Sequence, residues 1–125
     1  KGVTGDNLLA LLERRLDNVV FRLGMAMSRN QARQLVNHRH FLVNGKITNI
    51  PSFVVKEGDV VEIKEKSRKS SAFKAALESA GERTPIPAWL ELSKDEFKGK
   101  VVRMPEREDI TDDIKENLIV ELYSK

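Results

Sequence analysis

The sequence of 125 residues has no cysteine, one tryptophan, one tyrosine and no long hydrophobic run. Without cysteine, the chain has no disulfide, no thiolate zinc site and no cysteine nucleophile, which fits a reducing cytosol. No apolar segment approaches the roughly 20 residues that a helix needs to cross a bilayer, and no signal-peptide pattern opens the chain. The first residue is Lys1 rather than Met, so we expect a piece of a longer protein.

Acidic residues are missing from a long central block. No Asp or Glu occurs between Asp17 and Glu57. Residues 14–69 contain twelve basic and five acidic residues, although the formal net charge of the chain is only +3. A solvated surface normally mixes both signs, because a field of one sign repels itself. The block therefore indicates an anionic partner, and nucleic acid is the class that we favour.

The stretch Ser28–Lys46, SRNQARQLVNHRHFLVNGK, predicts an amphipathic helix followed by a tight β-hairpin. Ser28 suits the N-cap, because its hydroxyl can accept a hydrogen bond from an amide of the first turn. Ala32, Leu35 and Val36 fall on one side of the helix. The other side has Arg33, Asn37, Asn30 and Gln34, with Arg29 at the flank. The pair Asn44-Gly45 predicts a type I′ turn, which needs positive φ at both positions.

The polar face of this helix has the chemistry of an RNA-binding surface. Arginine and lysine neutralise phosphates and release counterions, and asparagine and glutamine can bind 2′-hydroxyls, sugars or base edges. We therefore predict contacts from the helix face, the bases that flank it, the hairpin and the basic run after residue 63. These residues are Arg14, Arg15, Arg22, Arg29, Arg33, Gln34, Asn37, His38, Arg39, His40, Asn44, Lys46, Lys64, Lys66, Arg68 and Lys69. Replacing Arg29 and Arg33 by Ala is expected to keep the fold and weaken RNA binding.

The remaining sequence predicts further short helices and strands. We expect helical structure over about 8–23, either as one helix or as two short helices with Asp17 or Asn18 as the second cap, and helices over about 71–80 and 113–122. We expect strands over about 41–43, 46–48, 60–65, 89–92 and 100–104, the last two paired with each other. The predicted fold class is α+β, with short helices packed on a small, mainly antiparallel β-sheet. We expect an RNA-binding domain at 17–104, and a helical scaffold remnant formed by the chain ends, 1–16 and 105–125.

Two groups of side chains have the types that metal sites use. His38 and His40 could ligate a metal, but no third ligand type is nearby, so we favour solvated or phosphate-facing histidines. Five carboxylates near the end of the chain could hold Mg²⁺, although turn residues and helix N-terminal acids explain them better. These are Glu106, Glu108, Asp109, Asp112 and Asp113. We predict no metal site, no cofactor and no catalytic residue.

Two further residues have a structural and a functional interpretation. Ser28 has no base of known placement, so the N-cap explains it and a nucleophilic role is not favoured. Trp89 could stack on a base, but a position beside Leu90 and Leu92 in a strand favours a core anchor.

The segment LLERRLDNVVFRLGMAMSRNQARQLVNHRHFLVNGK resembles the bacterial small-subunit ribosomal protein S-four family, including the RNA-binding module named after it. The similarity continues through KEGDVVEIKEKSRKS, PAWLELS, KGKVVRMPERED and LIVELYSK, and so covers nearly the whole chain. Many RNA-modifying enzymes and synthetases share the helix and VNG turn, whereas LERRLDNVVFRLG, WLEL and LIVELYSK are specific to the ribosomal protein. Arg39 is a departure, because many members have glycine there.

The resemblance implies a structural, cytoplasmic protein of the ribosome that binds folded small-subunit ribosomal RNA directly. It also implies that the protein nucleates assembly of the subunit body, contacts the neighbouring protein S-five and influences translational accuracy. It implies no membrane, small-molecule substrate or cofactor. The family has an N-terminal helical region, with a zinc site in some members, which would lie upstream of Lys1.

An RNA-modifying enzyme such as a pseudouridine synthase is the alternative. Such enzymes carry this module, and Arg15-Leu16-Asp17 resembles their catalytic arginine-leucine-aspartate motif. Here the triplet lies in a helix-forming run ahead of the module and has no catalytic sheet around it, so we predict that the chain is not an enzyme. A protein-binding scaffold is a third class, tested by asking whether RNA competes for its partner.

Overall fold

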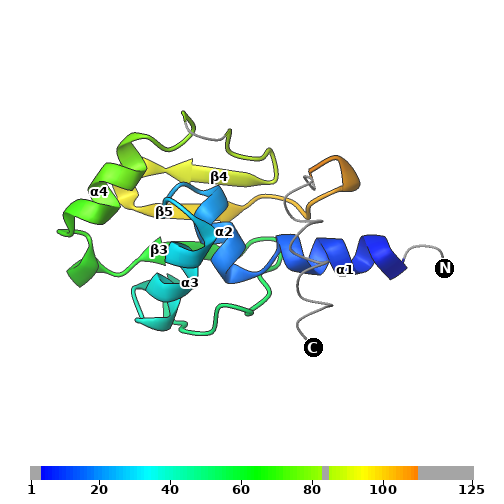
Figure 1. Ribbon diagram of the computed structural model, residues 1–125, viewed down its shortest axis with the longest axis horizontal. Helices are drawn as coiled ribbons and strands as arrows, with labels where there is room; N and C mark the ends of the chain where they lie inside the picture. The colour runs from blue at the N-terminus through cyan, green and yellow to red at the C-terminus, as the bar shows by residue number, and fades with distance from the viewer. Residues whose placement is uncertain (1–3, 83–84, 110–125) are drawn as a thin grey trace.

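The computed structural model describes residues 4–82 and 85–109, and Figure 1 shows short helices beside one β-sheet. The helices are α1 (Thr4–Glu13), α2 (Leu16–Arg22), α3 (Arg29–Asn37) and α4 (Ser71–Glu78), with 3-10 turns η1 (Glu65–Ser67), η2 (Lys94–Glu96) and η3 (Arg107–Asp109). The strands are β1 (Phe41–Val43), β2 (Lys46–Ile47), β3 (Val60–Ile63), β4 (Leu90–Ser93) and β5 (Lys98–Val101). The predicted α+β class is confirmed.

The sheet has the strand order β2-β1-β3-β5-β4, and each neighbouring pair is antiparallel. Because side chains alternate along a strand, one face of the sheet is apolar and the other is mixed. Phe41, Val61 and Val101 are buried on the first face, where they join the core with side chains of α2 and α3. In Figure 1, α2 and α3 cross the sheet, α4 lies at one end and α1 extends beyond the other.

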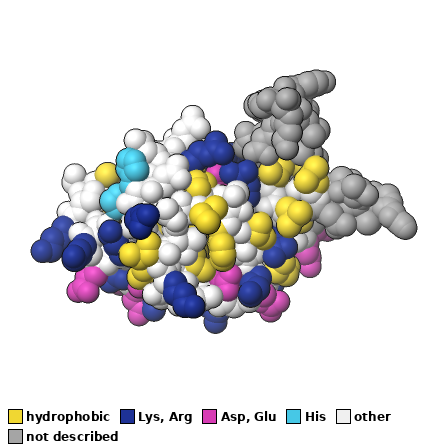
Figure 2. Space-filling view, turned by 90° about the horizontal axis from the view of Figure 1, so that it is seen from below, with side chains coloured by type: hydrophobic (Ala, Val, Ile, Leu, Met, Phe, Trp, Pro, Cys, Tyr) yellow, Lys and Arg dark blue, Asp and Glu magenta, His cyan; other side chains and the backbone are white. Residues whose placement is uncertain are grey.

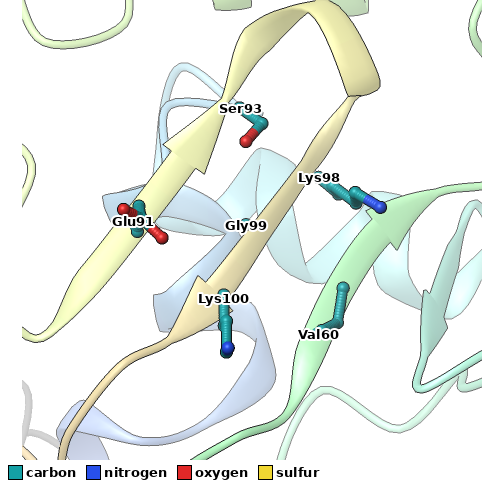
Figure 3. A pocket seen from close by; sticks show the side chains of 6 residues that line it. All are labelled: Val60, Glu91, Ser93, Lys98, Gly99 and Lys100. Carbon is teal, nitrogen blue, oxygen red and sulfur yellow. The ribbon is translucent and has the colours of Figure 1, made fainter.

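The opposite face of the sheet has no helix over it among the described residues. Figure 3 shows this face from close by, with Glu91, Ser93, Lys98 and Lys100 around a shallow groove and the helices behind the sheet. Glu91 lies opposite Lys100 in the register of β4 and β5. Cross-strand pairs of opposite charge suit a solvated sheet face.

Gly99 sets how closely α2 approaches the sheet. A Cβ atom at Gly99 would lie 2.5 Å from Leu23 Cδ2, well inside contact distance. Leu23 is fully buried, so its side chain fills the space that the glycine leaves open. Helix α2 can therefore pack directly onto β5.

The cap and turn predicted around α3 are confirmed. The Ser28 side chain accepts a hydrogen bond from the amide of Gln31 at 3.1 Å. The hairpin of β1 and β2 turns at Asn44 and Gly45, whose φ values are 53° and 84°. Both values are positive, as a type I′ turn requires.

Some predicted boundaries differ from those in the structure. Helix α2 begins after Arg15, not after Asp17 or Asn18. Arg15 is its N-cap residue, and the Arg15 side chain makes no capping hydrogen bond. The pairing of β4 with β5 is confirmed, but β5 begins and ends earlier than the predicted strand over 100–104. The predicted helix over 113–122 lies outside the described residues, and so does most of the scaffold segment predicted at 105–125.

Candidate nucleic-acid interface

Helix α3 presents one polar face and one buried face. Ala32 and Val36 are fully buried, whereas Arg33, Gln34 and Asn37 are exposed. The helical period of 3.6 residues places these two groups on opposite sides, because the apolar residues recur four positions apart. The three polar side chains are therefore presented together to solvent, as predicted.

Residues just after α3 extend this polar face. Arg39 is exposed and has a φ of 66°, immediately after the C-cap residue His38. A left-handed residue commonly ends a helix, and glycine is the usual residue there because it lacks a Cβ. Exposed Lys46 begins β2 across the hairpin. We call Arg33, Gln34, Asn37, Arg39 and Lys46 the α3 surface.

Arg29 lies at the start of α3 and is half-buried. Its Nε donates a hydrogen bond to Asn18 Oδ1 at 2.9 Å. Its guanidinium carbon lies 4.7 Å from the centre of the Phe21 ring, a distance typical of a cation–π contact. Two side chains of α2 therefore hold Arg29 in one orientation.

Arg14 and Arg15 lie between α1 and α2 and are half-buried. Arg14 Nε donates to the carbonyl of Val55 at 2.8 Å, and Arg15 pairs with Asp17 at 3.2 Å. These contacts occupy part of each guanidinium, which has five N–H donors. Both residues connect α1 and α2 to the segment at Val55, whose neighbour Val54 forms an isolated bridge with Arg15.

Arg22 is placed in the interior, so we leave this predicted RNA contact out of the α3 surface. Its side chain is 5% exposed and pairs with Glu13, whose side chain is 0% exposed, at 3.2 Å. Glu13 also accepts a hydrogen bond from Trp89 Nε1. Burial raises the pKa of Glu13, against the lowering effect of the Arg22 charge. A guanidinium in this position stabilises the junction of α1, α2 and Trp89 and is almost completely shielded from solvent.

The Asn44 side chain supports the hairpin. We predicted an RNA contact for this residue and did not predict this structural role. Its Nδ2 donates to Asp59 Oδ1 at 2.9 Å, and its Oδ1 accepts from the amide of Val60 at 2.9 Å. Asp59 is buried and also accepts from the amide of Lys56. The amide of Asn44 therefore ties the β1–β2 turn to the start of β3.

The basic residues at and after the end of β3, Lys64, Lys66, Arg68 and Lys69, differ in exposure and in their contacts. Lys66 and Lys69 are exposed, and Lys64 is half-buried. Arg68 donates to Glu62 at 2.9 Å and to the carbonyl of Ile63 at 2.8 Å. The two exposed lysines remain able to meet phosphates, whereas Arg68 is engaged with the end of β3.

His40 links α3 to the basic run. Its Nδ1 lies 2.7 Å from Ser67 Oγ, and its ring meets the Phe73 ring edge-on with centres 5.5 Å apart. Burial lowers the pKa of His40, and the positive charges of Lys64 and His38 lower it further. His38 is exposed, so the two histidines have different environments.

Figure 2 shows how these charges are distributed over one face. Lys and Arg side chains lie beside the histidines and near a patch of exposed hydrophobic side chains, and Asp and Glu side chains lie among them along the lower edge of the view. Large hydrophobic residues that are exposed in the described chain include Met27, Ile47, Ile50 and Phe53. The face therefore combines positive charge with apolar area, a composition that RNA backbone and sugars can both contact.

The carboxylate cluster near the end of the described chain is engaged in local structure. Asp109 pairs with Arg103 at 2.9 Å and accepts a hydrogen bond from the amide of Glu106 at 2.7 Å. Burial alone would raise the pKa of Asp109, but these hydrogen bonds bring it below its usual value. Asp112 and Asp113 lie outside the described residues. The Asp109 carboxylate thus fits the turn that we favoured over a Mg²⁺ site.

The triplet Arg15-Leu16-Asp17, which resembles a catalytic motif, lies at the junction of α1 and α2. Arg15 and Asp17 pair with each other, and Leu16 is fully buried in the core. Trp89 is also fully buried, which agrees with a core anchor. Across residues 4–82 and 85–109, no helix is long and apolar enough to span a membrane.

Comparison with known proteins identifies the module. Residues 14–61, which run from just after α1 into β3, match the S4 domain. Over all 125 residues the chain is 64% identical to the small ribosomal subunit protein uS4 of Citrifermentans bemidjiense. It is 62% identical to that of Desulforapulum autotrophicum and 57% identical to that of Heliobacterium modesticaldum. The chain is similar to uS4 proteins over all of its 125 residues.

The chain spans 60% of the length of these uS4 proteins. The resemblance stated from the sequence is confirmed, and these relatives are named as ribosomal proteins, not as enzymes, which supports the prediction of a non-enzyme. The S4 domain includes α3, the hairpin and the supporting helix α2. The residues of the α3 surface therefore all lie within the matched module.

Proposed function

We propose that this chain binds small-subunit ribosomal RNA directly, as a structural and non-catalytic part of the ribosome. The observation that carries the proposal is the α3 surface, on which Arg33, Arg39 and Lys46 are exposed cations of an S4 domain. The acid-free block between Asp17 and Glu57 leaves no carboxylate of its own to oppose them. The names of the uS4 relatives supply the RNA class, since they are proteins of the small ribosomal subunit.

The mechanism follows from the side chains on this surface. The cations neutralise phosphates and release counterions, which supplies a large share of the binding free energy. Gln34 and Asn37 offer both donors and acceptors, so they can meet 2′-hydroxyls that distinguish RNA from DNA. A helix packed on a sheet holds these groups at fixed spacing. Such a surface selects folded RNA by the placement of its backbone more than by its sequence.

Other predicted contacts join the proposal as flanking groups. Arg14, Arg15 and Arg29 lie on the side of α1 and α2, and His38, His40, Lys64, Lys66, Arg68 and Lys69 lie on the side of β3 and η1. The domain at 17–104 is proposed as the RNA-binding unit. From its similarity to uS4 proteins, we also propose that the protein acts in assembly of the subunit body, contacts protein S-five and influences translational accuracy.

The test compares two single substitutions that each remove one exposed cation. Arg33→Ala is on the α3 surface, and Lys100→Ala is on the opposite, uncovered face of the sheet. Affinity for purified small-subunit ribosomal RNA is measured by filter binding at fixed salt. Arg33→Ala is expected to weaken binding about tenfold, and Lys100→Ala to change it less than about twofold. Equal effects of the two substitutions would contradict a binding site on α3.

A further inference from the structure

Asn18 is a buried polar residue whose two functional atoms face different partners. Its side chain is on α2, and the residue is 2% exposed. Nδ2 donates to the backbone carbonyl of Glu13 at 2.6 Å, and Oδ1 accepts from Arg29 Nε at 2.9 Å. A carbonyl only accepts and a guanidinium only donates, so this orientation of the amide is the one that satisfies both partners.

The carbonyl that orients Asn18 is itself well anchored. Glu13 is the residue whose carboxylate accepts from Arg22 and Trp89 in the core. The backbone of Glu13 cannot shift without disturbing that buried pair, because an uncompensated buried charge is costly. A continuous set of contacts therefore runs from Trp89 through Glu13 and Asn18 to Arg29.

The Phe21 ring fixes the other side of the Arg29 guanidinium. The guanidinium carbon lies 4.7 Å from the ring centre, while Asn18 holds Nε. A planar group held at an edge and over a face loses little further freedom when it binds a phosphate. Asn18 orients Arg29 through a neutral acceptor and so adds no negative charge, unlike the contact of Asp17 with Arg15.

We propose that Asn18 is a positioning residue that presents Arg29 to an RNA phosphate at the edge of the α3 surface. This inference rests on the proposed function, since it assumes that RNA binds beside α3. It assigns a role in binding to two residues of α2, Asn18 and Phe21, which carry no charge. Arg29 begins α3, one turn before Arg33, so both arginines can meet one RNA strand.

The test is a double-mutant cycle in RNA binding. Asn18→Ala, Arg29→Ala and the double variant are titrated with small-subunit ribosomal RNA at several salt concentrations. Arg29→Ala is expected to weaken binding about tenfold, and Asn18→Ala several-fold. The double variant is expected to bind no more weakly than Arg29→Ala alone. Each variant should reduce the steepness of the log–log salt dependence by about 0.7 to 0.9, the share of one phosphate.

The salt dependence separates positioning from a merely structural role. A loosened fold would lower affinity without removing one particular phosphate contact, so thermal unfolding of each variant is measured alongside. If Asn18→Ala does not fold, Phe21→Leu decides, because it removes the aromatic face and keeps the Asn18 hydrogen bonds. Phe21→Leu is then expected to weaken binding and to have no further effect in the Arg29→Ala background.

Arg33→Ala distinguishes the two levels of failure. Unchanged binding of Arg33→Ala would contradict the proposed function itself. If Arg33→Ala weakens binding but Asn18→Ala leaves affinity and salt dependence unchanged, only the positioning role of Asn18 is overturned. Additive losses in the double variant would overturn it as well, because Asn18 would then act independently of Arg29.

Discussion

Trp89 Nε1 donates a hydrogen bond at 3.3 Å to Glu13 Oε2, between residues that are 76 positions apart in the chain. Arg22 pairs with the same carboxylate oxygen at 3.2 Å. Glu13 is 0% exposed, so both donors satisfy a charge that lies inside the protein. This buried group joins α1 and α2 to Trp89, the residue before β4, and supports the helices beneath the α3 surface.

Replacing Glu13 should destabilise the fold strongly. Glu13→Ala leaves the Arg22 charge buried without its carboxylate, and removal of one partner from a buried pair costs about 3–5 kcal/mol. The free energy of unfolding is measured by urea titration, with the fluorescence of the single tryptophan as the signal. Glu91→Ala on the uncovered sheet face serves as the control. A loss below about 1 kcal/mol for Glu13→Ala would show that the pair contributes little to stability.

Gly99→Ala should disturb the contact of α2 with β5. The added Cβ would lie 2.5 Å from Leu23 Cδ2, and Leu23 is fully buried. Overpacking of this kind costs about 1–3 kcal/mol. Leu23→Val is a smaller partner, so the double variant should recover part of the loss. Equal unfolding midpoints of Gly99→Ala and wild type in urea would contradict the close approach.

Arg39→Gly should change stability and RNA binding in opposite directions. Arg39 has a φ of 66°, which costs a residue with a Cβ about 1–2 kcal/mol relative to glycine. The free energy of unfolding of the variant should therefore be about 0.5–1 kcal/mol higher than that of wild type. The variant should nevertheless bind RNA more weakly, because one cation is lost. Arg39→Ala is the control, since it loses the cation and keeps the strain. A stabilised Arg39→Gly variant with unchanged RNA affinity would remove Arg39 from the α3 surface.

His40 should make stability depend on pH below 6.5. Burial and the charges of Lys64 and His38 lower the pKa of His40 in the folded state. Between this lowered pKa and the usual 6.5, the unfolded chain binds more protons, so stability falls as the pH falls through that window. Urea midpoints are compared across this range for wild type, His40→Gln and the exposed control His38→Gln. His40→Gln should lose the dependence, whereas His38→Gln should keep most of it, because it removes only one of the charges that lower the pKa of His40. Persistence of the dependence in His40→Gln would assign the effect to another group.

Much of the α3 region could be predicted from local pattern. The Ser28 cap, the buried positions of α3 and the Asn44-Gly45 turn all depend on residues within a few positions of one another. The exposure of Arg33 follows from the same helical period. The family resemblance also rested on contiguous motifs. It is confirmed by 64% identity to a uS4 protein over all 125 residues of this chain.

The roles of Arg22 and Asn44 could not be predicted in this way. Arg22 has the appearance of a surface cation in the sequence, but its partner Glu13 lies nine positions upstream and the second donor, Trp89, lies far downstream. Asn44 was predicted as a turn residue, which is confirmed, and as an RNA contact. Its side-chain amide, however, forms hydrogen bonds with Asp59 and Val60. These contacts depend on tertiary packing, which no local period encodes. The contacts of Asn18 and Phe21 with Arg29 could not be predicted for the same reason, and neither residue carries a charge that would have indicated a role in RNA binding.

The most direct test of the central claim is the salt dependence of binding to purified small-subunit ribosomal RNA. If the surface neutralises about five phosphates, log affinity should fall linearly with log salt concentration, with a slope near −4. Arg33→Ala should make the slope less steep by about 0.7 to 0.9, and Lys100→Ala should leave it unchanged. An affinity that stays the same from low to high salt would contradict the proposal that these cations bind RNA through its phosphates.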